Sequence, residues 1–236
     1  MGISFSGKLT GSMTGYYKSS YEVDGKQKFY TLTQFEASLL DSANLTVVWL
    51  ILSLIQPTAA RRAFPCWDEP LLKATFAVTL ISREDTVNLS NMPAISEDVY
   101  SGETSTLNES PRLAELLSPL KNEQGKWKIT RFETTPPMSS YIVAYANGHF
   151  EYLEKSVVMP LSGKTLPLRI YGSCRFFSPN FANQPEPTPA TADNIHQAQF
   201  ALDVKASVLP LYEKVFDVEY PLPKLDTLVV SGRDGM

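Results

Sequence analysis

The residues with the greatest potential for chemistry lie in one short segment, residues 61–70, which reads Arg-Arg-Ala-Phe-Pro-Cys-Trp-Asp-Glu-Pro. Its paired arginines and paired acids could bind each other or an ion. Metal binding by Asp68 and Glu69 would need further oxygen donors, and the neighbouring sequence offers none. We therefore interpret the segment as structural: its prolines fix the loop, Phe64 and Trp67 anchor it, and its charges satisfy one another and backbone groups.

Hydrolysis of peptides by zinc needs three protein ligands, an open coordination position for water and a carboxylate base. The chain has two histidines, His149 and His196, and no His-x-x-x-His spacing. His149 falls in a predicted strand and His196 at the start of a predicted helix, so we interpret both as structural or exposed. The sequence thus predicts no catalytic residue and no metal ligand in this chain.

Composition and charge narrow the class of protein. The 236 residues are 43% hydrophobic and 19% charged, as in globular proteins. A net charge of -4 and the lack of a basic block argue against a nucleic-acid partner. The two cysteines, Cys66 and Cys174, form no disulfide framework and indicate a reducing compartment. The apolar run at residues 45–55 is shorter than the roughly 20 residues that span a bilayer, so we expect a cytoplasmic protein without a membrane span.

The hydrophobic pattern changes period along the chain. Up to about Phe150 it is typical of strands, and it predicts an antiparallel β-sandwich or saddle rather than a βαβ fold. We expect strands at residues 3–9, 16–23, 28–35, 74–81, 126–134, 140–150 and 166–171. After Ala190, apolar residues recur at three and four positions and predict one long amphipathic helix, whose apolar positions are Ile195, Phe200, Ala201, Val204, Val208, Leu211, Tyr212 and Val215. A strand is expected at residues 225–230, and a domain boundary near Tyr171.

Five sequence segments, taken in order, carry a family resemblance. They are residues 30–36 (YTLTQFE), 61–70 (RRAFPCWDEP), 88–93 (NLSNMP), 135–150 (TPPMSSYIVAYANGHF) and 212–228 (YEKVFDVEYPLPKLDTL). Together they resemble the aminopeptidase N and puromycin-sensitive aminopeptidase family of zinc exopeptidases, and most closely its fungal cytosolic branch. The resemblance implies zinc as the cofactor of the full-length family. It also implies a peptide with a free N-terminus as the substrate.

The resemblance also implies two substrate-binding residues. In the family, the residue that closes the strand corresponding to residues 30–36 meets the α-ammonium group of the substrate, and here that residue is Glu36. Gln34 lies on the same strand face because side chains alternate along a strand. A partly desolvated carboxylate selects a cationic N-terminus strongly. The alternative is a solvated glutamate at the end of a strand.

Set against the family, the chain divides into three parts. Residues 1–171 correspond to the N-terminal β domain, with an atypical insertion at residues 37–56. Residues 172–189 form a second, proline-rich insertion, and residues 190–236 form the truncated start of an α/β catalytic domain. We hypothesise that both insertions and the tail at residues 231–236 are translated non-coding sequence, because each interrupts an otherwise continuous match.

The family's His-Glu-x-x-His and Gly-Ala-Met-Glu-Asn motifs are both missing from this sequence. The sequence therefore predicts a fragment of a zinc-dependent aminopeptidase that lacks activity and binds no zinc by itself. The alternative is a non-catalytic β domain that binds peptide or a protein partner.

Overall fold

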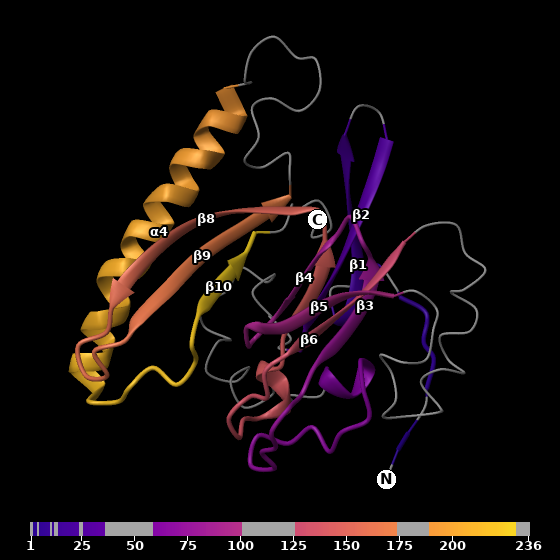
Figure 1. Cartoon of the computed structure of the whole chain (residues 1–236), viewed down its shortest axis with the longest axis horizontal. Coiled ribbons are helices and arrows are strands. Elements are labelled where there is room, and N and C mark those ends of the chain that lie inside the picture. Colours follow the sequence, from indigo (N-terminus) through magenta and orange to yellow (C-terminus); the bar gives the residue numbers. More distant parts are fainter. Residues whose placement is uncertain are drawn as a thin grey trace, which may run out of the picture.

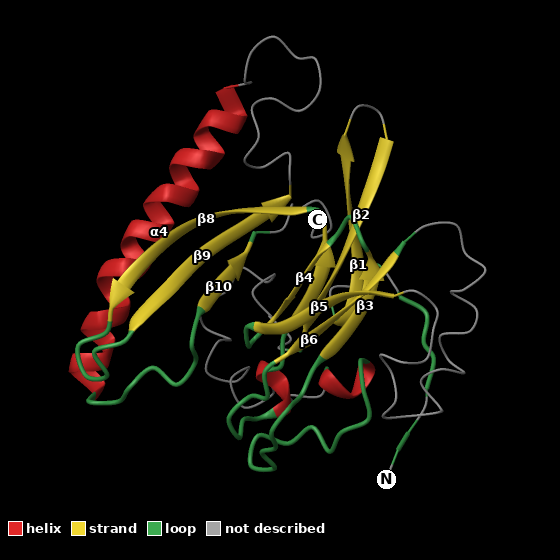
Figure 2. Cartoon of the chain, viewed as in Figure 1, coloured by secondary structure: helices red, strands yellow, loops and turns green. Residues whose placement is uncertain are grey.

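The computed structural model describes residues 2–3, 5–9, 11, 14–23, 26–35, 59–100, 126–173 and 189–229. In this part of the chain the strands form three β-sheets, and one α-helix lies late in the chain, before the last strand of the third sheet (Figures 1 and 2). Strand pairing is antiparallel except between the last strand and its neighbour. The predicted fold class, mainly β with a single long helix late in the chain, is confirmed.

The first sheet has the strand order β1-β2-β7-β4. Its strands are β1 (Gly15–Val23), β2 (Lys26–Gln34), β7 (Tyr145–Gly148) and β4 (Val87–Ser90). Strands β1 and β2 pair along their whole length, from Gly15 opposite Gln34 to Val23 opposite Lys26. Tyr30 is buried from β2 and packs with Phe150 from the third sheet at a ring-centroid distance of 6.1 Å. Aromatic side chains thus join the first sheet to the third.

The second sheet has the order β3-β6-β5. Its strands are β3 (Thr79–Arg83), β6 (Trp127–Phe132) and β5 (Ala94–Tyr100). Asn88 of β4 is buried, and its side-chain amide donates to Ser82 Oγ at 2.9 Å and to Thr130 Oγ1 at 2.8 Å. Because both acceptors lie in the second sheet, this amide holds the first two sheets together.

The third sheet has the order β10-β9-β8 and carries the helix on one face (Figure 1). Its strands are β8 (Phe150–Val158), β9 (Thr165–Ser173) and β10 (Leu225–Leu228), and the helix is α4 (Pro189–Phe216). Leu168 and Ile170 of β9 are buried against Ala198 and Leu202 of α4. The predicted domain boundary at Tyr171 falls within β9 and stays a prediction.

The end of α4 is fixed by local contacts. Asp217, directly after the helix, has a φ of 53°, the left-handed conformation that commonly ends helices. Glu213 in the last turn is buried, and its carboxylate accepts from the backbone N–H groups of Leu161 at 2.9 Å and Tyr220 at 3.0 Å. This carboxylate ties the helix to the β8–β9 turn and to the chain leading into β10.

Two sequence predictions about local structure are wrong. Residues 3–9 were expected to form a strand, but the described residues among them form no regular structure. Ile3 and Phe5 are exposed there, and an alternating pattern needs a neighbouring strand to become part of a sheet. Residues 140–150 are not one strand, because η4 (Ser140–Ile142) and β7 occupy most of them.

The helix itself is confirmed, but its buried face differs from the prediction. Phe200, Val204, Leu211 and Val215 were expected to face the core, and all of them are exposed. The buried positions are instead Ala198, Leu202 and Glu213. Ala198 and Leu202 lie on this second face and pack against Leu168 and Ile170 of β9.

Some predictions fall outside the described residues. The insertion at residues 37–56 and the tail at residues 231–236 lie entirely there, and so does most of the segment 172–189. Within the described residues, no helix combines the length and apolar character that crossing a membrane would require.

Candidate functional site

The end of β2 positions the predicted substrate-binding residues. Gln34 is the last residue of β2 and lies opposite Gly15 of β1. Its side chain is half-buried, and its Oε1 accepts a hydrogen bond from the Tyr17 hydroxyl at 3.5 Å. Glu36 lies outside the described residues, so its pairing with Gln34 stays a prediction.

Phe35, between these two residues, anchors the strand end. Only 3% of Phe35 is exposed, and its ring lies 5.8 Å from the ring of Phe64 and 6.3 Å from that of Tyr145. Met138 and Ala60 are buried in the same cluster. The 61–70 segment therefore shares a core with the end of β2, and the two are positioned together.

Asp68 organises the 61–70 segment. Its side chain is fully buried, and its Oδ2 accepts from the backbone N–H of Arg61 at 3.1 Å. Its Oδ1 accepts from the Ser140 hydroxyl at 2.9 Å, and the Arg61 guanidinium lies 3.5 Å from Oδ2. Asp68 has a φ of 58°, a left-handed conformation that Asp tolerates better than most residues. These contacts support the structural interpretation of the segment, whose charges satisfy one another and backbone groups.

One part of that interpretation is wrong. Trp67 was expected to anchor the loop, but it is 82% exposed, and its neighbour Leu71 is exposed as well. The anchor is Phe64, which packs against Phe35 and lies 6.1 Å from the ring of Phe76.

Cys66 in the same segment is shielded from reaction. Burial raises the pKa of the Cys66 thiol, and the negative charge of Asp68 raises it further. Because the thiolate is the reactive form, a raised pKa keeps this cysteine in its less reactive thiol form at neutral pH.

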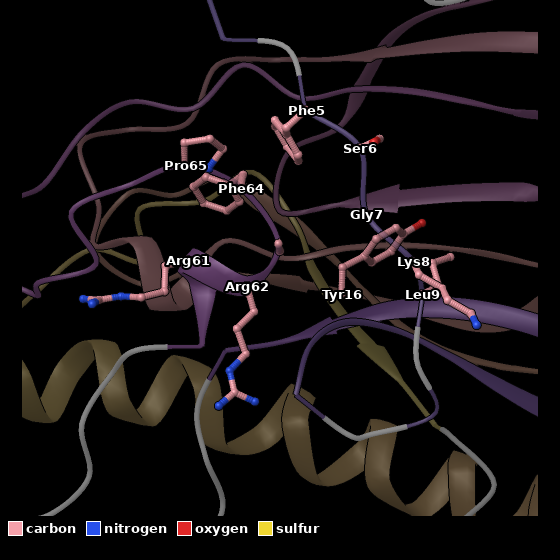
Figure 3. A pocket seen from close by; sticks show the side chains of 11 residues that line it. Phe5, Ser6, Gly7, Lys8, Leu9, Tyr16, Arg61, Arg62, Phe64 and Pro65 are labelled. Carbon is pink, nitrogen blue, oxygen red and sulfur yellow. The ribbon is translucent and has the colours of Figure 1, made fainter.

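A cavity of about 510 Å³ lies between residues 5–9 and the 61–70 segment. Figure 3 shows Phe5 beside Phe64 and Pro65, with the side chain of Arg62 directed away from them. The Arg62 guanidinium donates to Thr14 Oγ1 at 3.0 Å. The described residues that line this cavity include basic side chains and no carboxylate, and such a lining does not suit the cationic end of a peptide.

A second cavity, of about 310 Å³, lies between the first and third sheets. Lys224 is buried beside it, and its ammonium group donates to the Ser90 carbonyl at 2.7 Å and pairs with the Asp226 carboxylate. Burial, with a smaller effect of Asp226, raises the pKa values of Tyr171 and Tyr220 to about 12. The polar groups of this cavity thus link two sheets and stay uncharged or paired.

Comparison with known proteins now adds to these observations. The peptidase M1 N-terminal domain matches residues 1–45 and 43–114. The chain is 33% identical to aminopeptidase 2, mitochondrial, of Saccharomyces cerevisiae over 97% of its own length and 17% of the relative. It is also 33% identical to aminopeptidase M1 of Arabidopsis thaliana, over 97% of this chain and 18% of that protein. Identity to the puromycin-sensitive aminopeptidase of Caenorhabditis elegans is 33% over 96% of this chain and 17% of that protein.

The predicted relationship to the M1 aminopeptidase family is confirmed. The chain spans less than a fifth of the length of these relatives. What matches is therefore a limited part of a longer aminopeptidase architecture.

Zinc is the cofactor of the M1 aminopeptidases, but the residues described here do not fit a zinc site. His149 lies between β7 and β8, with Nε2 3.9 Å from the Asp85 carboxylate. His196 is an exposed residue of α4. Within the described ranges, no group of three His, Cys, Asp or Glu side chains converges on a point where a metal ion could bind. No zinc-dependent step is therefore assigned to these residues.

Proposed function

We propose that this chain supplies the substrate-recognising β portion of a zinc-dependent aminopeptidase that removes N-terminal residues from peptides. In this proposal Glu36 and Gln34 bind the free N-terminus of the peptide. The observation that carries the proposal is the match of nearly the whole chain to aminopeptidases, combined with the rigid position of Gln34 at the end of β2.

The structure around Gln34 supports this role physically. Pairing with β1 and the buried ring of Phe35 restrain the strand end. A ligand that meets a restrained site loses less binding free energy to ordering of the protein. The Gln34 carbonyl oxygen can accept from an ammonium group, and a carboxylate at position 36 would supply the opposite charge.

The chain by itself is proposed to lack aminopeptidase activity. This follows from the missing His-Glu-x-x-His sequence and from the placement of the two histidines on separate elements. Elemental analysis of the purified chain should detect negligible zinc, and aminoacyl reporter substrates should stay intact. Stoichiometric zinc together with chelator-sensitive hydrolysis would overturn this part of the proposal.

The cellular location of the protein and its class of partner are also proposed from the sequence. A net charge of -4 and two cysteines fit a cytoplasmic protein that acts on peptides and binds no nucleic acid.

The second candidate function is a non-catalytic β domain that binds peptide or a protein partner. The observation that favours it is that the 61–70 segment uses its charged groups internally, as Asp68 does with Arg61 and Ser140. A segment whose buried carboxylate is used in this way stabilises a scaffold.

Peptide binding tests the proposed recognition. A short peptide with a free amine should bind the chain more tightly than its N-acetylated form in a calorimetric titration. Glu36→Ala should weaken binding of the free peptide by roughly ten- to a hundredfold, since a charge-assisted contact contributes about 1.5–3 kcal/mol. Gln34→Ala should have a smaller effect.

The matched control is Gln27→Ala, because Gln27 is an exposed amide on the same strand whose side chain donates to Ser20 Oγ at 3.0 Å. This control should bind like the unmodified chain. Acetylation should barely affect binding to Glu36→Ala, because the contact is already lost. If acetylation weakens binding to both proteins equally, Glu36 does not recognise the N-terminus.

A further inference from the structure

The cavity between residues 5–9 and the 61–70 segment, called the Arg62 cavity from here on, has the size of a small-molecule site (Figure 3). Its volume of about 510 Å³ lies within the range of roughly 300–1,000 Å³ that such sites occupy. The proposed recognition of peptides uses the end of β2, whereas the described lining of this cavity comes from residues 5–9, from Tyr16 of β1 and from the 61–70 segment. A ligand of this cavity would therefore be distinct from the N-terminus of that peptide.

Two walls of the Arg62 cavity are held in place by contacts with the core. The ring of Phe64 lies 5.8 Å from the buried ring of Phe35. The ring of Tyr16 lies 4.9 Å from that of Tyr145, and its hydroxyl forms a hydrogen bond with Thr31 Oγ1 at 2.7 Å. Because both rings are already restrained, an aromatic ligand can pack against them with little further ordering of the protein.

A third wall comes from the N-terminal segment. Figure 3 shows the ring of Phe5 beside Phe64 and Pro65. Phe5 is 57% exposed, so a ligand in the cavity would cover apolar surface that is now in contact with water. Removal of such surface from water favours binding.

The cations at the Arg62 cavity differ in how they are neutralised. The Arg61 guanidinium lies 3.5 Å from the Asp68 carboxylate. Among the described residues, no carboxylate pairs with Lys8 or Arg62, and the Arg62 Nη1 donates to the uncharged Thr14 Oγ1 at 3.0 Å. A guanidinium has five N–H donors, so four of those of Arg62 are left for an anion, together with its full charge.

Close packing against β1 fixes the position of Arg62. Gly15, the first residue of β1, has a φ of 77°, and a Cβ placed on it would lie 2.9 Å from the Arg62 Cβ. Glycine at this position therefore lets Arg62 lie directly against the strand. In Figure 3 the side chain of Arg62 extends away from Phe5 and Phe64, so its charged group lies at one end of the cavity and not between the rings.

Aromatic walls beside a cation that no described carboxylate neutralises are complementary to an amphipathic anion. We propose that the Arg62 cavity binds a small aromatic carboxylate, whose ring packs against Phe5 and Phe64 and whose carboxylate pairs with the Arg62 guanidinium. The planar guanidinium suits a carboxylate because it can donate two parallel hydrogen bonds to it. Lys8 adds positive charge to the same lining.

The test titrates the full chain with cinnamate in an isothermal calorimeter. The matched probe is cinnamyl alcohol, which has the same planar aromatic body and no charge. The alcohol should bind at least about tenfold more weakly, because a hydrogen bond to a charged group contributes more than a neutral one. Phe5→Ser should weaken binding of both probes, since the ring of Phe5 contacts their shared aromatic body.

Arg62→Gln separates the effect of charge from that of shape. Glutamine retains a side-chain N–H that can donate to Thr14, and it removes the positive charge. This variant should bind cinnamate about tenfold more weakly or worse and should bind the alcohol as before.

The matched control is Lys164→Gln, which removes one exposed positive charge from the turn between β8 and β9, away from the cavity. It should bind both probes like the unmodified chain. Circular dichroism should give the same spectrum for all of these proteins.

Three results would overturn the proposal. The first is that the unmodified chain does not bind cinnamate at millimolar concentration, and the second is that it binds cinnamate and the alcohol equally well. The third is equal affinity of Arg62→Gln and Lys164→Gln for cinnamate. None of these results bears on Glu36, because the peptide titration tests a different site.

Discussion

The 61–70 segment and helix α4 both carry large apolar side chains, but they differ in how those side chains are covered. Phe64 of the segment packs against Phe35 and Phe76, and the charges of Asp68 and Arg61 meet partners within the same chain. The outward apolar residues of α4 have no such cover among the described residues; they are Phe200, Val204, Leu211 and Val215. Apart from the exposed ring of Trp67, the first region therefore closes on this chain's own core, whereas the outer side of α4 packs against none of the described elements.

The largest expected difference in unfolding free energy is between substitutions on the two faces of α4. Leu202 is 1% exposed on the inner face, and Leu202→Ala should lower the free energy of unfolding by about 3 kcal/mol, because it leaves a cavity beside Leu168. Val204→Ala on the exposed side of α4 should change it by less than about 0.5 kcal/mol. Urea unfolding of both variants measures the difference. Equal losses would mean that the outer face is also part of this chain's core.

Removing the buried carboxylate of Asp68 should lower the free energy of unfolding slightly less than Leu202→Ala does. Asp68→Ala should cost about 2–3 kcal/mol, because it leaves the Arg61 N–H and the Ser140 hydroxyl without their acceptor. It also places alanine at a positive φ. Trp67→Ala, the control in the same loop, should be close to neutral. If Asp68→Ala unfolds at the same urea concentration as Trp67→Ala, the segment is not held by its internal hydrogen bonds.

The free energy of unfolding should depend on alkaline pH through Tyr171 and Tyr220, which line the cavity between the first and third sheets. The tyrosines of an unfolded chain ionise near the usual pKa of 10.0, whereas burial raises the pKa values of Tyr171 and Tyr220 to about 12. The folded state therefore holds these protons at higher pH, and stability should fall as pH rises from about 10 to about 12. Tyr171→Phe should make this fall shallower in urea titrations across that range. An unchanged slope would show that Tyr171 is not shielded.

The smallest expected effect is on the reaction rate of the Cys66 thiol in the 61–70 segment. In a Cys174→Ser background, Cys66 should react with iodoacetamide more slowly than a thiol in an unstructured peptide at mildly alkaline pH, because burial and Asp68 raise its pKa. Asp68→Asn removes the charge and should speed the reaction. A rate like that of the free peptide would mean that the segment opens readily.

Some features of the fold could be predicted from local pattern. The β-branched and aromatic residues on either side of Asp24-Gly25 predicted the antiparallel pair of β1 and β2. Leu225–Leu228 was found as a strand after a proline-rich turn. The relationship to the M1 aminopeptidases also followed from short motifs, because their residue types are too specific to arise from hydrophobic patterning alone. Strands β4, β5 and β8 were missed. In β4 the polar residue Asn88 is satisfied by partners in other strands, which local pattern does not show.

The sequence by itself determined that α4 is a helix and that residues 61–70 form a self-supporting loop. It could not determine which face of α4 is buried, because a helix with apolar residues on two faces satisfies the helical period either way. Packing against Leu168 and Ile170 decided that. It likewise could not place Trp67, because an aromatic ring favours burial, whereas in the fold Phe64 packs against Phe35 and Phe76 and Trp67 stays 82% exposed. Local propensity sets the element, and long-range contacts decide which side of it meets the core.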